Sequence, residues 1–226
     1  MANKYVNRPE AAKVQEEPTG SEAFFAKNKK AILYVVAVIV IVIVGAVLYN
    51  NYVVKPKETK ASTALAKGQD YFNAEMYEQA LNGDSISFAG LLSVAEQYSG
   101  TDAANLANLY AGLSYAKLGK WQEAVTYLEK FKGKGDKMIS PAAEGALGNA
   151  YAHIEQLDKA VEHLKKAAKM ADNNSLSPTF LIQAGEILEN QGKPEEALVL
   201  YQQVKDNYPN SMQYQTIDKY IERVTK

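Results

Sequence analysis

Few side chains in this sequence could do chemistry, and they are far apart. The two histidines, His153 and His163, are ten residues apart on different predicted helices, so a metal site would need carboxylate partners brought in by folding. There is no cysteine, which excludes disulfides, thiol catalysis and thiolate metal sites. Gly133 and Gly135 fit a loop between helices and follow no predicted strand, so they do not indicate a phosphate-binding loop. We therefore predict no catalytic, cofactor-binding or metal-binding residues and expect a protein that is not an enzyme.

The charge balance points away from nucleic acid as a partner. The chain of 226 residues has a formal net charge of −1, with lysine and arginine nearly matched by aspartate and glutamate. A nucleic-acid-binding domain is usually strongly basic, because phosphate contacts dominate its affinity. We predict no nucleic acid partner.

The elements that would position a site are predicted helices, and their spacing repeats. After residue 60, strand-like alternation is absent, and good helix formers dominate. Small residues recur at Gly112, Gly148 and Gly185 and again at Ala124, Ala160 and Ala197, with large residues at Tyr115, Tyr151 and Leu188. Two antiparallel helices approach closely where both present small side chains. Each unit is therefore predicted to be a helical hairpin that stacks on its neighbours.

This pattern resembles the tetratricopeptide repeat, a helix–turn–helix unit of about 34 residues. The resemblance implies an all-α solenoid of about four hairpins. The repeats are expected at about residues 105–138, 141–174 and 178–211, after a degenerate first repeat at 61–100 and before a capping helix at 212–226, so that the domain covers 61–226. The first repeat is degenerate because about eight extra residues interrupt its second helix near Gly83. Ser140-Pro141 and Ser177-Pro178 are each predicted to begin a helix, with the serine as the capping residue.

In tetratricopeptide domains the first helix of each hairpin lines a concave groove, and this register gives nine candidate partner-binding residues. They are Leu109, Leu113, Lys117, Asn149, His153, Ile182, Glu186, Glu189 and Asn190. Apolar side chains beside polar ones suit an extended or helical peptide. The alternative is that the degenerate first repeat or the linker helix covers Leu109 and Leu113. A groove that grips C-terminal carboxylates is not expected, because Gly145 stands where that subclass carries a lysine.

A long apolar run precedes the repeats. Residues 31–49, from Ala31 to Tyr49, carry no charge and would form a helix of roughly 28 Å, close to the ~30 Å hydrocarbon core of a membrane. We predict a transmembrane helix between a disordered tail at 1–30 and a linker at 50–60. A removable signal peptide is the alternative, since V-G-A at 44–46 resembles a cleavage site, but the apolar run continues beyond it. Lysines at 27, 29 and 30 favour a cytoplasmic N-terminus and an extracytoplasmic domain.

One span followed by a short repeat domain resembles the bacterial envelope proteins that are ancillary subunits of the SecYEG translocon. The segments A-L-N-G-D at 80–84 and S-G-T-D-A-A-N-L-A-N-L-Y-A-G at 99–112 are similar to members of that family. The resemblance implies a scaffold on the periplasmic side of a bacterial inner membrane that assists protein export or periplasmic chaperoning. Its partners would be the translocon, exported chains or chaperones. Two alternatives stay open: a scaffold for cell-envelope assembly, and a regulator acting through the cytoplasmic tail.

Overall fold

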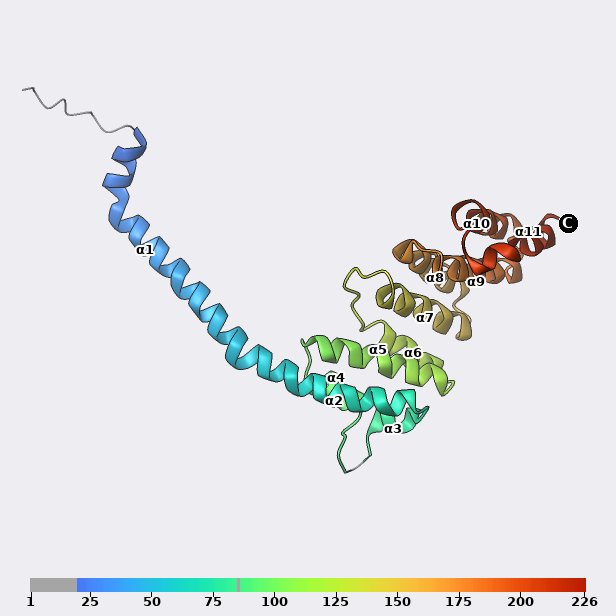
Figure 1. Cartoon of the computed structure of the whole chain (residues 1–226), viewed down its shortest axis with the longest axis horizontal. Coiled ribbons are helices and arrows are strands. Elements are labelled where there is room, and N and C mark those ends of the chain that lie inside the picture. The colour runs from blue at the N-terminus through green and yellow to red at the C-terminus, as the bar shows by residue number, and fades with distance from the viewer. Residues whose placement is uncertain (1–19, 85) are drawn as a thin grey trace, which may run out of the picture. The chain divides into compact units, whose positions relative to one another are not determined.

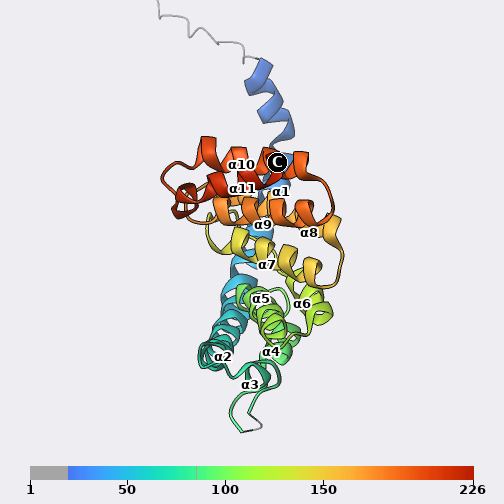
Figure 2. The ribbon, with the colours of Figure 1, turned by 90° about the vertical axis from the view of Figure 1, so that its right-hand side faces the viewer.

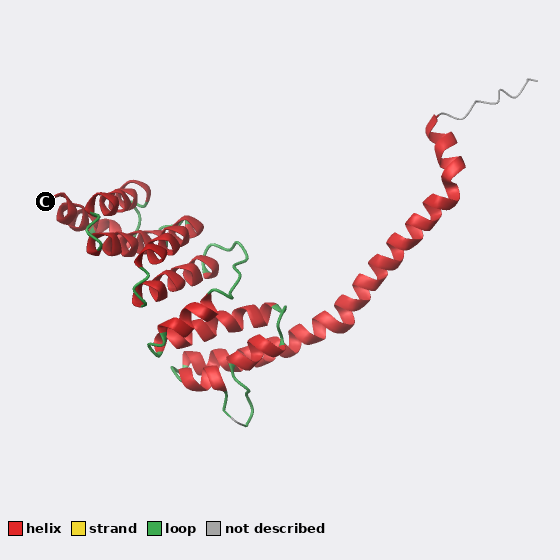
Figure 3. Ribbon diagram, turned by 180° about the vertical axis from the view of Figure 1, so that it is seen from behind, coloured by secondary structure: helices red, strands yellow, loops and turns green. Residues whose placement is uncertain are grey.

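The computed structural model describes residues 20–84 and 86–226, so the first 19 residues of the predicted tail lie outside the described residues. The described part contains helices, turns and short loops but no strand (Figure 3), which confirms the all-α prediction. By internal contacts the chain divides into two compact units, Met1–Val53 and Val54–Lys226.

The first unit is the apolar helix α1 (Gly20–Tyr49), followed by the π-helix η1 (Asn50–Val54). The large apolar side chains from Leu33 to Tyr49 are half exposed or more. Within the described residues, this stretch is the one helix whose length and composition would let it cross a membrane. Helix α1 already begins at Gly20, so residues 20–30 are helical where the sequence predicts a tail. The predicted linker at 50–60 is helical as well, because extending an existing helix is cheap once its first turn has formed.

The second unit is a stack of helical hairpins (Figures 1 and 2). Its helices are α2 (Lys55–Asn73), α3 (Tyr77–Asn82), α4 (Leu91–Gln97), α5 (Asp102–Lys117), α6 (Trp121–Leu128), α7 (Ile139–His153), α8 (Leu157–Ala171), α9 (Ser177–Asn190), α10 (Pro194–Asn207), the 3-10 turn η2 (Met212–Gln215) and α11 (Ile217–Thr225). Helices α5 and α6, α7 and α8, and α9 and α10 pack pairwise as hairpins, and α6 contacts α7 while α8 contacts α9. Helix α11 packs on α10 at the C-terminal end of the stack.

The first hairpin has a broken second helix, made of α3 and α4, which both pack on α2. Two glycines with positive φ, Gly83 and Gly90, sit at the break, and their backbones lie against each other. A Cβ atom added to Gly83 would lie 2.0 Å from the carbonyl oxygen of Phe88. The close backbone approach therefore requires glycine and holds the inserted residues to the hairpin.

The small residues of the repeat make room for a large partner rather than for each other. A Cβ atom on Gly112 would lie 2.6 Å from Cγ of Leu128, and one on Gly148 would lie 2.9 Å from Cγ of Leu164. In the third repeat the corresponding glycine, Gly185, faces the ring of Tyr201. Each partner lies sixteen residues after its glycine in the sequence. The alanines of the pattern, Ala124, Ala160 and Ala197, are fully buried in the core clusters beside these contacts.

The predicted serine caps are wrong. Helix α7 begins at Ile139 and α9 at Ser177, so Ser140 and Ser177 lie inside their helices. At α7 the capping group is Asp136, whose carboxylate accepts hydrogen bonds from the backbone N–H groups of Met138, Ile139 and Ser140. At α9 the Oδ1 atom of Asn173 accepts from two backbone N–H groups at the helix start. Each serine instead bonds to groups of the preceding loop, and that of α9 also to the end of α8.

Candidate functional site

The first helices of the hairpins, α5, α7 and α9, share one groove. It has a volume of about 600 Å³. It is lined by Leu113, Ala116, Lys117, Trp121, Ala146, Asn149, Ala152, His153, Gln183, Glu186, Ile187 and Asn190. Except for Trp121, which opens α6, all of these residues come from the three first helices. The stacking of successive hairpins therefore builds one surface from residues separated by a full repeat.

Six of the nine residues predicted for the groove line it. They are Leu113, Lys117, Asn149, His153, Glu186 and Asn190. They form two ladders at a repeat spacing, one of Leu113, Asn149 and Glu186 and one of Lys117, His153 and Asn190. Whether these residues bind a partner stays a prediction, but the structure brings them together.

The other three predicted residues lie elsewhere. Leu109 and Ile182 are buried in the core, with 6% and 7% of their surface exposed. Leu109 lies one turn before Leu113, and Ile182 lies one turn before Glu186. Residues at this position of the repeat face the core and not the groove. Gly145 holds the same place in α7 and receives the ring of Phe180, to which an added Cβ would lie 2.2 Å away. The cover over Leu109 is the neighbouring α6–α7 cluster, so the alternative that the first repeat covers it is wrong. Leu113 is partly buried against the same cluster.

The third, Glu189, is used for structure. Its Oε2 accepts from Nε of Arg223 at 2.8 Å and its Oε1 accepts from Nη2 at 2.6 Å, while the hydroxyl of Tyr201 donates to Oε1. Burial alone would raise the pKa of Glu189, but the hydrogen bonds from Arg223 and Tyr201 outweigh it and hold this pKa below its ordinary value. Ala116 and Ala152 hold the corresponding positions in α5 and α7, and both line the groove. Glu189 does not line it, because Arg223 of α11 binds its carboxylate.

An aromatic stack forms one wall of the groove. The rings of Trp121 and His153 lie with centroids 3.6 Å apart and planes 2° from parallel. Trp121 belongs to the groove as well as to the hairpin. The paired rings present a flat, rigid apolar surface at low entropic cost.

The groove lining also contains an amide with an unpartnered oxygen. The Oε1 atom of Gln183 is buried and accepts no hydrogen bond from the described residues. Leaving such an acceptor unpaired costs roughly 1–3 kcal/mol, and because the atom is buried a ligand in the groove would reach it only if the side chain turned. Sequence reasoning missed Gln183, although its register matches Ala146 one repeat earlier and both line the groove.

Both histidines have protein partners. His153 stacks on Trp121, and Nδ1 of His163 lies 2.7 Å from Oε1 of Glu144, which Nζ of Lys166 also contacts at 2.8 Å. Within residues 20–84 and 86–226, no group of three or more histidine and acidic side chains could hold a metal ion. The groove thus offers apolar walls, amides and a balanced pair of charges, Lys117 and Glu186, which is an arrangement for binding.

Comparison with known proteins agrees with the architecture. A family model described as a tetratricopeptide repeat-like domain matches residues 22–224. Among solved structures, nearly identical TPR-like repeats of a Podospora anserina protein described as a kinesin light chain align with a TM-score of 0.56 at 15% identity, covering 74% of this chain and 86% of that one. A point variant of the same protein gives the same TM-score and identity, with 74% and 85% covered. At this identity the likeness concerns the fold alone. No curated protein sequence matches this chain.

Proposed function

Because the chain belongs to the tetratricopeptide repeat-like family, whose repeats are protein–protein interaction scaffolds, we propose that its groove binds an extended segment of a partner protein. The observation that carries this proposal is one groove built by α5, α7 and α9, in which the stacked rings of Trp121 and His153 share the lining with amide side chains. A polypeptide backbone supplies N–H donors at regular intervals, and its side chains supply apolar groups for the aromatic wall.

The charge of the groove favours a backbone ligand over a strongly charged one. Lys117 and Glu186 lie on the same surface, and the other polar side chains of the lining are the amides of Asn149, Gln183 and Asn190 and the imidazole of His153. Amides both donate and accept, so they can bond to either side of an extended peptide without selecting its charge.

The scaffold is proposed to work from a membrane. Residues 31–49 would span it once, with the N-terminus in the cytoplasm and the repeat domain on the outer side. Tethering raises the local concentration of the groove beside a membrane complex, so a modest affinity suffices. By the resemblance to ancillary SecYEG subunits, that complex would be the export channel of a bacterial inner membrane, and the ligands would be exported chains or periplasmic chaperones.

In-cell photocrosslinking tests the groove and the partner together. A photoreactive residue is placed at Leu113, Asn149 or Glu186, and adducts are identified by mass spectrometry. Control probes are placed at Glu162 and Lys165 of α8, which are exposed and do not line the groove. Adducts with export-channel subunits or exported chains, from the groove probes and not from α8, are expected.

Other outcomes redirect the proposal. Adducts with cell-wall or outer-membrane assembly proteins would keep the groove and replace export by envelope assembly. Capture that survives groove substitutions but is lost on deleting residues 2–19 would favour regulation through the tail. Equal yields from α5, α7, α9 and α8 probes would show that the groove is not the working surface.

The absence of cysteine gives a clean test of orientation. Single cysteines replacing Asn3 and Ser175 are treated with a membrane-impermeant maleimide on intact spheroplasts. We expect labelling of the variant at 175 before lysis and of the variant at 3 only after lysis. The reverse pattern would place the repeat domain in the cytoplasm and would contradict the export assignment.

A further inference from the structure

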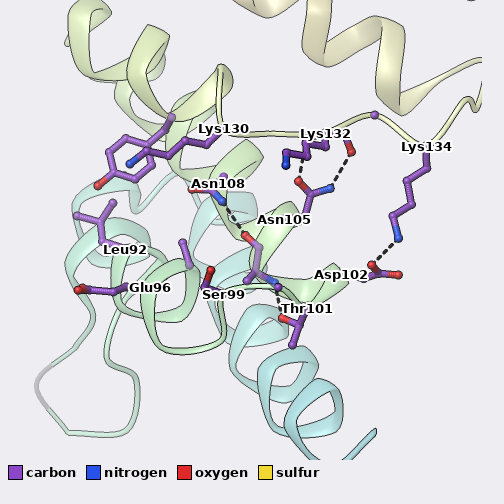
Figure 4. Close-up of a pocket in the computed structure, with 15 residues that line it drawn as sticks. Leu92, Glu96, Ser99, Thr101, Asp102, Asn105, Asn108, Lys130, Lys132 and Lys134 are labelled. Atoms are coloured by element: carbon purple, nitrogen blue, oxygen red, sulfur yellow. Dashed lines mark hydrogen bonds and ion pairs between the residues drawn. The ribbon is translucent and has the colours of Figure 1, made fainter. Parts of the chain in front are cut away.

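A second cavity lies at one end of the hairpins, away from the groove. It has a volume of about 790 Å³ and is bounded by α4, by the first half of α5, by Tyr127 and by the loop after α6 (Figure 4). Three lysines from that loop, Lys130, Lys132 and Lys134, line it together with apolar side chains such as Leu92. A cavity with ammonium groups on one side and apolar groups on another suits an amphiphilic anion.

The loop is held so that its lysines face the cavity. The side chain of Asn105 clamps the backbone of Lys132, since its Nδ2 donates to the carbonyl oxygen and its Oδ1 accepts from the N–H, both at 2.8 Å. The ammonium of Lys130 lies 4.3 Å from the ring centroid of Tyr127. In Figure 4 Lys130 and Lys132 lie along the same stretch of loop, while Lys134 turns to Asp102.

Carboxylates near this end are already engaged. Glu58 accepts from the backbone N–H groups of Asp102 and Ala103 at 2.8 and 2.9 Å. Asp136 accepts hydrogen bonds from the first backbone N–H groups of α7. Asp102 forms an ion pair with Lys134, and Glu129 accepts a hydrogen bond from the hydroxyl of Tyr151. The remaining lining carboxylate, Glu96, points away from Lys132 in Figure 4.

Two of the three lysines of the cavity are not paired with a carboxylate in the described part of the chain. Among the described residues, Lys130 and Lys132 form no ion pair, and Lys57 donates only to the carbonyl oxygen of Ser99, at 2.8 Å. The lining carries three lysines against the two carboxylates of Glu96 and Asp102, so its net positive charge attracts an anion from outside.

The sequence position of the cavity indicates which anion is abundant there. Ser99 lines the cavity and accepts the hydrogen bond from Lys57, in the first turn of α2. Helix α2 follows the apolar residues 31–49 after a few residues of chain. If residues 31–49 span a membrane, phospholipid headgroups lie within reach of that turn.

We propose that this cavity binds the phosphate of an anionic phospholipid headgroup. Lys130 and Lys132 pair with the phosphate oxygens, and Leu92 and the ring of Tyr127 contact the glycerol end. Inorganic phosphate shares the chemistry and is the alternative source. The proposal rests on the proposed membrane anchor but not on the peptide groove.

The test uses the full chain in detergent micelles. Ser99→Cys supplies the single attachment point for a solvatochromic dye, because the chain has no cysteine of its own. Short-chain phosphatidylglycerol, short-chain phosphatidylcholine and inorganic phosphate are each titrated. We expect saturable binding of phosphatidylglycerol, weakened roughly thirtyfold by Lys130→Gln with Lys132→Gln, since each lysine near an anionic headgroup contributes about a factor of five.

The matched control is Lys159→Gln with Lys165→Gln on α8. Lys159 also lies over a tyrosine ring, that of Tyr151, and Lys165 is also exposed, so the control removes the same charges elsewhere. Its titration is expected to match the parent. Circular dichroism of both double variants confirms that the helices are intact.

Three results would overturn the assignment. Equal responses to phosphatidylglycerol and phosphatidylcholine would show that charge is not recognised. Equal weakening by the two double variants would show that the cavity is not the site. Saturation by inorganic phosphate without a response to phosphatidylglycerol would assign free phosphate in place of lipid. Flotation of the full chain with neutral vesicles tests the anchor separately, because insertion of residues 31–49 needs no anionic lipid.

Discussion

At the scale of single residues, the loop carboxylates stabilise helix starts rather than take part in chemistry. Asp136 accepts from the hydroxyl of Ser140 and from the backbone N–H groups that begin α7, and these bonds lower its pKa to about 2. Asp84 accepts in the same way from the backbone N–H groups of Ile86, Ser87 and Phe88, which belong to the loop before α4, and its pKa is also held far below the ordinary value.

These bonds predict acid sensitivity with a defined direction. The folded-state pKa of Asp136 lies below its unfolded value of about 3.9, so its contribution to stability is complete above pH 4 and is lost as pH falls toward 2. Urea unfolding of the parent and of Asp136→Asn should therefore differ most near pH 5 and converge near pH 2. A gap that stays constant over this range would contradict the assigned role of the carboxylate.

Substitutions of Glu186 and Glu189, which are three residues apart, are predicted to have different effects. Glu189→Ala removes the acceptor for Arg223 and Tyr201, and should cost about 1–3 kcal/mol and raise hydrogen exchange in α11. Glu186→Ala should leave α11 protected and reduce crosslinking from Leu113 and Asn149. If both substitutions affected α11 alike, Glu189 would not be a specific clamp.

Which residues would face the groove could be predicted only in part. The positions of Leu113, Asn149 and Glu186 follow from the repeat register, which the sequence states directly. Burial of Leu109 depends on how far each hairpin is rotated relative to the next, and the spacing of the repeat does not determine that rotation. Glu189 is predicted to face the groove, but its carboxylate binds Arg223, 34 residues away, and no local pattern indicates such a long-range pair.

At the scale of helices, one glycine in each hairpin sets the separation of its two helices. An added Cβ on Gly148 would lie 2.9 Å from Cγ of Leu164, 3.1 Å from its backbone nitrogen and 3.2 Å from the carbonyl oxygen of Ala160. Two of these three neighbours are backbone atoms, so the helix and not a side chain would have to move.

Gly148→Val should therefore destabilise the domain by roughly 1–3 kcal/mol in thermal or urea unfolding. The adjacent change Asn149→Val is the control, since that side chain lines the open groove and should alter stability by less than about 1 kcal/mol. Equal effects of the two changes would mean that helix propensity, not the close contact, dominates at this position.

Some features of the helices could be predicted from the sequence, and others could not. Hairpins and the interruption near Gly83 follow from periodicity and from glycine, and both are present. Serine followed by proline is a common helix start, but here Asp136 and Asn173 accept hydrogen bonds from backbone N–H groups that precede or include the serine, and each helix begins at or before its serine. The sequence indicates the small residues of the repeat, but not that each glycine packs against the large residue sixteen positions later.

At the scale of the whole molecule, the apolar helix and the repeats are separate compact units that meet at Val53 and Val54. A chain that begins at Val54 should thus keep the helical signal of the repeats and lose membrane association. Circular dichroism and flotation with neutral vesicles measure the two properties. Loss of helical signal beyond that of residues 20–53 would mean that the repeats need the first unit to fold.

The stack of Trp121 on His153 gives the protein an intrinsic optical reporter. Trp121 is the sole tryptophan of the chain, and its indole forms part of the groove wall. Its emission depends on the imidazole that lies flat against it, 3.6 Å away between centroids. A ligand that slides between or over these rings changes the fluorescence of the unlabelled protein, so occupancy of the groove can be followed in real time without attaching a dye.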